Sequence, residues 1–203
     1  MSSKILTDVD IANMALGYLG EQKIASLAEA TKEAKVISLY YSQTLDEIME
    51  SRRWSAGRKR ARLTREEDHP AFGFVYSFLL PSDCLRVLDV VELPESGIVH
   101  RPPFIRNFEI EGRKLYTDYP YTGLVFVREV IASDLTPLMI RGFSLTLAAK
   151  IAPSLGESRL GPMLSDQAYN ALKDAWISDV RQSRSMENSS FEQQSREWFG
   201  EVR

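Results

Sequence analysis

Apolar residues recur at spacings of three and four over the first 65 residues of the chain. One short stripe precedes Gly20 and a longer one follows Thr31; together they consist of Val9, Ala12, Leu16, Leu19, Ala34, Ile37, Tyr41, Leu45 and Ile48. This spacing places side chains on one face of an α-helix. Thr7 and Thr31 can cap the two helix starts, and Gly20 can end the first helix. We therefore expect helical structure throughout residues 1–65.

The pattern changes between residues 72 and 131, where β-branched and aromatic residues dominate. Strand-like runs occupy residues 74–80, 85–93 and 123–130, and Pro81 ends the first of them. Residues 108–118 read as two strands around Gly112, which is a hairpin signal. We expect four or five antiparallel strands in one small sheet.

Helical spacing returns after residue 135. Pro137 suits a first helical turn, and Pro153 and Gly156 are expected to end that helix. It is apolar on almost every face, as a helix in the middle of a bundle would be. A last helix begins near residues 162–165, and its predicted buried stripe consists of Tyr169, Leu172, Trp176 and Val180.

These elements predict an α+β fold. Residues 1–65 and 135–184 would form a helical domain resembling a four-helix bundle. An antiparallel β-domain of residues 72–131 is inserted into it, and residues 185–203 form a polar C-terminal arm.

Composition and charge limit the possible functions. The chain has 203 residues, 44% of them apolar, and 25 basic against 28 acidic residues give a net charge of −3. These are ordinary values for a globular protein, and the charge excludes one that is basic throughout. No apolar run approaches the roughly 18 residues of a membrane helix, so we expect no membrane partner.

Signatures of catalysis are nearly absent. The chain has no phosphate-binding loop, no dinucleotide fingerprint and no zinc-protease motif. Cys84 with His69 or His100 could in principle form a nucleophile and base, but a cysteine at the start of an apolar strand usually acts as a small hydrophobic residue. Zinc usually needs about four Cys or His ligands, and none cluster here. We expect neither an enzyme, a metal nor a cofactor.

One basic segment stands out from the balanced charge. Residues 51–65 contain no acidic residue and seven basic ones, namely Arg52, Arg53, Arg58, Lys59, Arg60, Arg62 and Arg65. Clustered cations can contact nucleic-acid phosphates. They can equally pair with acidic neighbours or with another subunit. Because no known DNA-reading motif accompanies the segment, we favour the second interpretation over sequence-specific DNA recognition.

Large aromatic residues interrupt the polar C-terminal arm. They are Phe191, Trp198 and Phe199. Residues 185–203 contain too little apolar surface to order by themselves. Aromatic side chains in such an arm are typical anchors for a partner groove.

Several stretches taken together resemble the tail tubular protein A-like head-to-tail adaptors of tailed bacteriophages. They include ALGYLG at residues 15–20, IASL at 24–27, RWSAGRKRARL at 53–63, YSFLLPSDCLRVL at 76–88, IEGRKLYTD at 110–118 and LTLAAKIA at 145–152. The resemblance spans residues 10–182 and is carried by the order and spacing of these stretches.

The resemblance implies a structural virion protein, assembled in the host cytoplasm. Such adaptors form a ring, usually a dodecamer, that joins the capsid portal to the tail or nozzle protein and surrounds the channel through which DNA leaves. The basic segment would then face a neighbouring subunit or the DNA channel, and the three aromatic residues of the arm would dock on the portal or the next subunit. The alternative is a nucleic-acid-binding regulator that uses residues 52–65.

Overall fold

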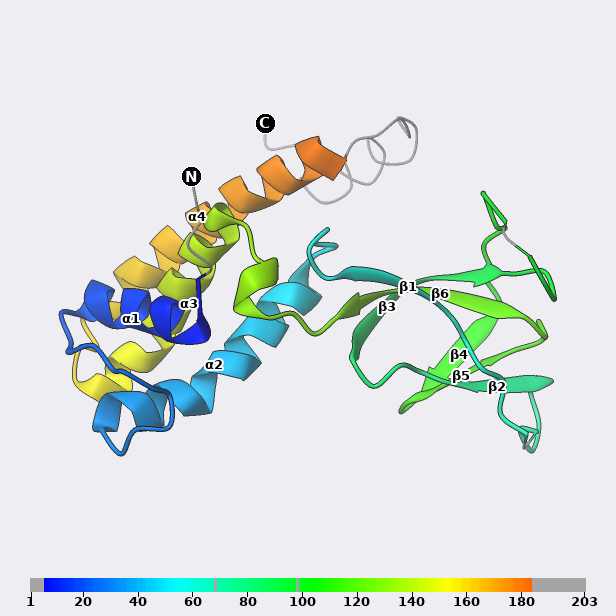
Figure 1. Ribbon diagram of the computed structural model, residues 1–203, viewed down its shortest axis with the longest axis horizontal. Helices are drawn as coiled ribbons and strands as arrows, with labels where there is room; N and C mark the ends of the chain where they lie inside the picture. Colours follow the sequence, from blue (N-terminus) through cyan, green and yellow to red (C-terminus); the bar gives the residue numbers. More distant parts are fainter. Residues whose placement is uncertain (1–5, 68, 98, 184–203) are drawn as a thin grey trace.

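The computed structural model describes residues 6–67, 69–97 and 99–183. The described chain is α+β, with four α-helices and two small antiparallel sheets. The helices gather in one lobe and the strands in another, so that the molecule is elongated (Figure 1). We call these parts the helical lobe and the β lobe.

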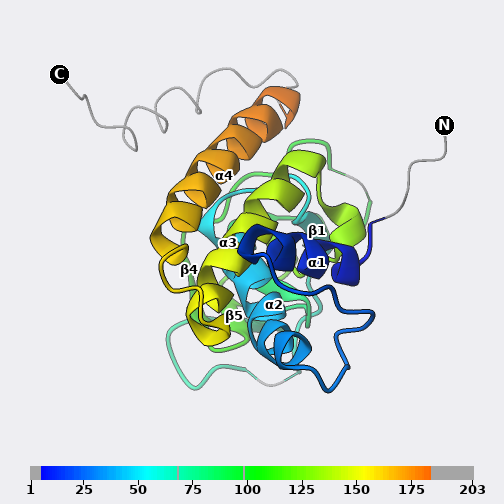
Figure 2. The same ribbon diagram turned by 90° about the vertical axis from the view of Figure 1, so that its left-hand side faces the viewer.

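The helical lobe is built around its third helix. Its helices are α1 (Asp8–Leu19), α2 (Lys32–Ser51), α3 (Pro137–Leu155) and α4 (Gly161–Ser183). Helix α3 packs against α1, α2 and α4, as the view along the lobe shows (Figure 2). Its buried residues lie on several faces, from Met139 to Leu155. The expectation of a central apolar helix is therefore confirmed.

Local capping signals in the sequence hold in the structure. Thr7 caps α1 as predicted and forms a capping box with Asp10, in which the amide of Asp10 donates to Oγ1 of Thr7 over 3.2 Å. The hydroxyl of Thr31 accepts from the amide of Ala34, and Gly20 ends α1 with φ +75°. These contacts satisfy backbone groups that helix ends leave without partners.

Pro153 does not end α3, contrary to our expectation. It lies inside the helix, which continues to Leu155 before Gly156 adopts the left-handed conformation with φ +102°. A proline this close to the end removes only one hydrogen bond of the last turns, so the helix can continue past it.

The buried face of α4 also differs from the predicted stripe. Tyr169 is 62% exposed, and the other three residues of that stripe are only half-buried. The face toward α3 instead carries mostly small residues, namely Gly161, Leu164, Ala168, Ala171, Ala175 and Asp179. The two helices approach closely at Gly142, where an added Cβ would lie 2.5 Å from Cδ2 of Leu172. Small side chains on both helices permit this approach.

The β lobe contains two three-stranded sheets rather than the single sheet that we expected. One sheet has the order β1 (Arg58–Arg62), β6 (Thr122–Arg128), β3 (Cys84–Glu92), and the other has the order β2 (Tyr76–Leu79), β5 (Lys114–Thr117), β4 (Phe108–Glu111). The predicted hairpin is confirmed, with Gly112 at φ +57° between β4 and β5. A second hydrophobic core, which includes Phe78, Leu115 and Phe126, lies in this lobe.

The expectation of helix up to residue 65 is wrong. Helix α2 ends at Ser51, and β1 pairs antiparallel with β6 from Arg58 opposite Val127 to Arg62 opposite Gly123. Helical spacing misled us here because β1 is an edge strand of only five residues, mostly charged. Such a strand shows no alternation of apolar and polar positions.

Helix α3 is the one helix among those described whose length and mean hydropathy would suit a membrane span. However, 61% of the apolar window is buried inside the protein. This burial is typical of a helix at the centre of a folded core.

We predict that Gly142→Ala destabilises the protein. The added methyl group must displace Leu172, and overpacking of this kind costs about 1–3 kcal/mol, against a gain in helix propensity of about 1 kcal/mol. We expect a net loss of up to about 2 kcal/mol in urea unfolding. Gly17→Ala is the matched control, because Gly17 is exposed on α1 with nothing within 4 Å of an added Cβ. Equal stabilisation by both substitutions would contradict the close packing of α3 and α4.

Candidate interaction surfaces

A buried tryptophan fixes the start of the basic segment. Trp54 is fully buried, its indole Nε1 donates to the carbonyl of Ile48 over 2.8 Å, and its ring meets the edge of Trp176 at 5.5 Å. The amide of Ser55 donates to Oδ2 of Asp179 over 3.0 Å, and the Ser55 hydroxyl donates to the other carboxylate oxygen. The end of α4 therefore lies beside the chain three residues before β1 begins.

Four of the seven basic residues contact an acidic or aromatic side chain within the chain. The guanidinium of Arg52 lies 5.6 Å from the ring centre of Trp176, and Arg53 pairs with Asp89 at 3.3 Å. The other two are Lys59 and Arg65, which contact Asp83 at 2.8 Å and the ring of Tyr76 at 5.2 Å. Two of these contacts are ion pairs and two are with aromatic rings, so all four side chains have neighbours within the chain.

Arg58, Arg60 and Arg62 differ from the other four. They occupy alternate positions of β1, so their side chains lie on one face, opposite Lys59 and Ala61. All three are exposed, and no carboxylate partner for them is recorded among the described residues. Arg62 donates only to the carbonyl of Pro94, over 3.0 Å. We call these three residues the basic stripe.

A groove of about 310 Å³ runs beside the basic stripe. Arg60 and Arg62 line it together with Gly123 and mainly apolar neighbours, which include Val91, Leu93, Val99 and Pro102. Gly123 allows close packing here, because an added Cβ would lie 2.8 Å from Cγ2 of Val91 and 2.9 Å from Cδ1 of Leu93, and these side chains would have to shift. Positive charge and apolar surface are therefore adjacent.

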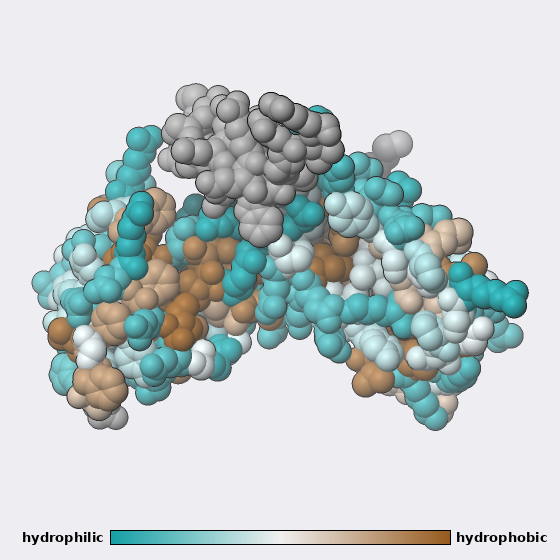
Figure 3. Space-filling view, turned by 180° about the vertical axis from the view of Figure 1, so that it is seen from behind, coloured by the Kyte–Doolittle hydropathy of each residue, from teal (hydrophilic) through white to brown (hydrophobic). Residues whose placement is uncertain are grey.

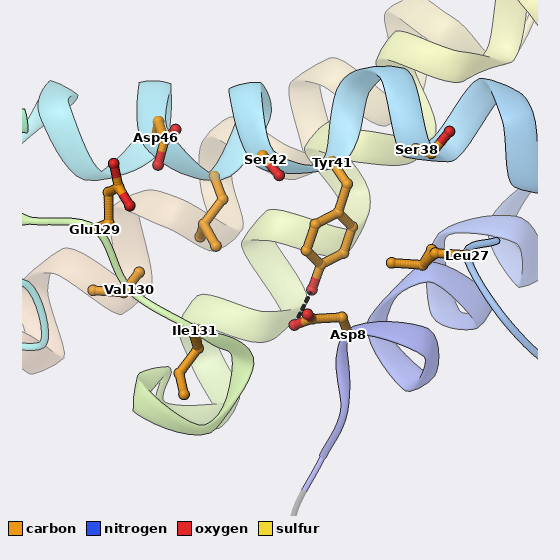
Figure 4. A pocket seen from close by; sticks show the side chains of 10 residues that line it. Asp8, Leu27, Ser38, Tyr41, Ser42, Asp46, Glu129, Val130 and Ile131 are labelled. Carbon is orange, nitrogen blue, oxygen red and sulfur yellow. Dashed lines mark hydrogen bonds between the residues drawn. The ribbon is translucent and has the colours of Figure 1, made fainter. Parts of the chain in front are cut away.

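A second surface, which sequence reasoning missed, is acidic. A cleft of about 420 Å³ lies between α2, the start of α1 and the chain that follows β6, and we call it the acidic cleft (Figure 4). Its carboxylates belong to Asp8, Asp46 and Glu129, and the side chains of Asp46 and Glu129 lie close together. No lysine or arginine is among the residues that line it. The lobes meet at this point of the fold.

The surroundings of Asp46 in the acidic cleft disfavour its ionised form. Burial raises the pKa of Asp46, and the negative charges of Glu129 and Glu50 raise it further. Tyr41 donates from its hydroxyl to Oδ1 of Asp8 over 3.0 Å, and burial, together with the Asp8 charge, raises the pKa of its phenol. Among the described residues, the lining of the cleft thus concentrates negative charge, and Arg128, which neighbours Glu129 in the chain, pairs with Asp134 at 3.0 Å.

Only part of the acidic cleft could be predicted from the sequence. Asp46 and Glu50 are four residues apart and share a helix face, which is visible in the sequence. Asp8 and Glu129 come from distant positions, and only the packing of α1 and of the chain after β6 against α2 brings them near.

The candidate catalytic residues do not form a site. Cys84 is half-buried, and burial raises the pKa of its thiol, which disfavours the thiolate. Nδ1 of His69 lies 3.0 Å from the carbonyl of Val75, and His100 lines the groove beside the basic stripe. Over residues 6–67, 69–97 and 99–183, no hydrogen bond joins Cys84 to either histidine, and no three His, Cys, Asp or Glu side chains could hold a metal ion together.

The aromatic residues predicted as anchors, Phe191, Trp198 and Phe199, lie outside the described residues. Comparison with known proteins found no matching family model and no matching curated protein. The features that bear on function are therefore the family resemblance, the basic stripe and the acidic cleft.

We predict that Asp46→Asn stabilises the protein at neutral pH. Since the folded-state pKa of Asp46 is raised, its contribution to stability is fully present below the ordinary value of 3.8 and is lost as the pH rises through the folded-state pKa. The asparagine side chain of the variant does not ionise and so avoids that loss. The variant's gain in free energy of unfolding should be measurable by denaturant unfolding at pH 7 and should vanish below pH 3.8.

Glu47→Gln is the control for this prediction, because it makes the same charge change one residue away. Glu47 accepts from Nζ of Lys150, so its neutralisation should give no gain. If both variants gained equally at pH 7, the general negative charge rather than the cleft would be responsible.

Proposed function

We propose that this protein is a head-to-tail adaptor of a tailed bacteriophage. It forms a ring that joins the capsid portal to the tail and surrounds the channel through which DNA leaves. In this proposal the helical lobe is a four-helix bundle, the β lobe is an inserted domain, and residues 185–203 are an arm that docks on the portal.

The observation that carries the proposal is the way in which the chain builds its two lobes. Helices from before residue 52 and after residue 136 share one hydrophobic core, and the strands between them contribute to a second core. This is the architecture that the resemblance over residues 10–182 implies, namely a helical domain carrying a β-domain. It supports the proposal independently of individual motifs.

The function of such an adaptor depends on the surfaces that contact neighbouring subunits rather than on catalytic groups. A ring subunit needs a stable core and faces that match its neighbours. The basic stripe and the acidic cleft are two faces of opposite charge on different elements. Arginines that face a channel would contact phosphates without reading sequence.

The alternative is a nucleic-acid-binding regulator that uses residues 52–65. It is less well supported, because four of the seven cations have partners within the chain and Trp54 is fully buried. Only the basic stripe remains for phosphates, and the whole chain has a net charge of −3.

Light scattering coupled to size-exclusion chromatography tests the proposal. The protein should form a ring-sized species, either alone or when the portal protein of the same virus is added, and the mass gives the copy number. A protein that stays monomeric with the portal, yet binds DNA with an affinity that falls steeply with salt, would support the regulator instead.

Deletion of residues 186–203 tests the arm. We expect the truncated protein to unfold at the same temperature as the full chain, because the deleted segment lies beyond α4. Portal association, measured by the same scattering experiment, should weaken at least about tenfold through loss of aromatic anchors. Phe191→Ala, Trp198→Ala and Phe199→Ala in the full chain are the finer comparison. Undiminished association of the truncated protein would remove the arm from the proposal.

A further inference from the structure

Strand β1 presents an open edge. The amide of Arg128 donates to the carbonyl of Gly57, and the amide of Leu63 donates to the carbonyl of Thr122. Odd-numbered positions of β1 therefore turn their backbone groups toward β6, and even-numbered positions turn theirs away from the sheet. Among the described strands, β1 pairs with β6 alone. The basic stripe occupies these even-numbered positions.

The basic stripe is a row of three cations for which the described part of the chain shows no carboxylate partner. Alternate residues of a strand are about 6.6–7 Å apart, so three guanidinium groups can follow one line. Each guanidinium can bind a carboxylate through two parallel hydrogen bonds. The four other cations of the segment already have acidic or aromatic partners, which leaves this row for a partner outside the chain.

The acidic cleft is the matching surface on the same molecule. Asp8, Asp46 and Glu129 line it, and no cation among the lining residues offsets their charge. An arginine brought into the cleft would relieve the repulsion between Asp46 and Glu129. The cleft and the basic stripe lie on different elements, and no contact between them is recorded within the described part of the chain.

We propose that the basic stripe of one copy docks into the acidic cleft of the next copy. This contact rests on the proposed function, since it is the contact that would join neighbours in the ring. It is heterologous, because each copy uses one surface for one neighbour and the other surface for the opposite neighbour. Such a contact produces a ring if its rotation closes.

Apolar surface beside both sets of charges favours a protein partner over DNA. Ile131 is 63% exposed at the acidic cleft, and the half-buried Leu93 and the 39% exposed Val99 lie beside the basic stripe. Protein interfaces combine an apolar centre with polar groups, whereas phosphate contacts do not need apolar neighbours.

Charge exchange between the two surfaces tests the contact. One variant carries Arg60→Glu and Arg62→Glu, and a second carries Asp46→Lys and Glu129→Lys. The mass of each is compared with that of the unchanged protein at low salt, with and without the portal. Each variant alone should associate at least about tenfold more weakly than the unchanged protein, because it places like charges opposite one another at the contact.

Mixing supplies the decisive comparison. In an equal mixture, the new glutamates of one variant meet the new lysines of the other, so assembly should return, as it should in a single chain with all four changes. Arg106→Glu with Arg159→Glu is the control for charge alone, since both residues are exposed and lie outside the two surfaces. Circular dichroism checks folding, and the milder pairs Arg60→Gln with Arg62→Gln and Asp46→Asn with Glu129→Gln replace any variant that unfolds.

The outcomes separate this contact from the proposed function. If the unchanged protein forms a ring and both variants do so equally well, the adaptor proposal stands and the contact is wrong. If both variants fail and the mixture fails too, the contact is also wrong. Loss of DNA binding without loss of assembly in the arginine variant would assign the stripe to DNA instead. Absence of any association of the unchanged protein, with portal and at low salt, would overturn both proposals.

Discussion

Burial of Trp54 is the constraint on which the relation between the two lobes depends. Its indole fills the helical core while its Nε1–H is satisfied by the carbonyl of Ile48, so that a large polar-edged side chain is buried without an unpaired donor. The neighbouring Ser55 holds the end of α4 through Asp179. Arg53 and Arg86 add links between the end of α2 and β3. These contacts hold the chain segment that leads into β1 against the helical lobe.

Local signals were predictable from the sequence and tertiary choices were not. Caps such as Thr7 and Thr31 depend on residues three positions away, and the hairpin at Gly112 depends on one glycine. The buried face of α4 depends on close packing against α3, where Gly142 leaves room for Leu172 and where the fully buried positions of α4 are mostly glycine and alanine. The spacing of apolar residues in one helix carries no information about the shape of the helix that packs against it.

The same division applies to the charged surfaces. The seven cations of residues 51–65 were visible, but strand alternation and partners such as Asp83 and Asp89 decide which of them remain available. The acidic cleft joins residues separated by more than a hundred positions, so the sequence could show only its part on α2. Most of the surface seen from behind is hydrophilic, with apolar side chains gathered on both lobes (Figure 3).

The arginines of β1 also oppose pairing of this strand edge with the same edge of another copy. An open strand edge is a template on which an identical edge can pair, and continued pairing leads to sheets that grow without limit. Two copies aligned edge to edge would bring two rows of like charge into register, and this repulsion opposes such growth. Copies of the protein at high concentration would therefore resist pairing along this edge and the fibril growth that follows from it, because each copy presents the same row of exposed arginines.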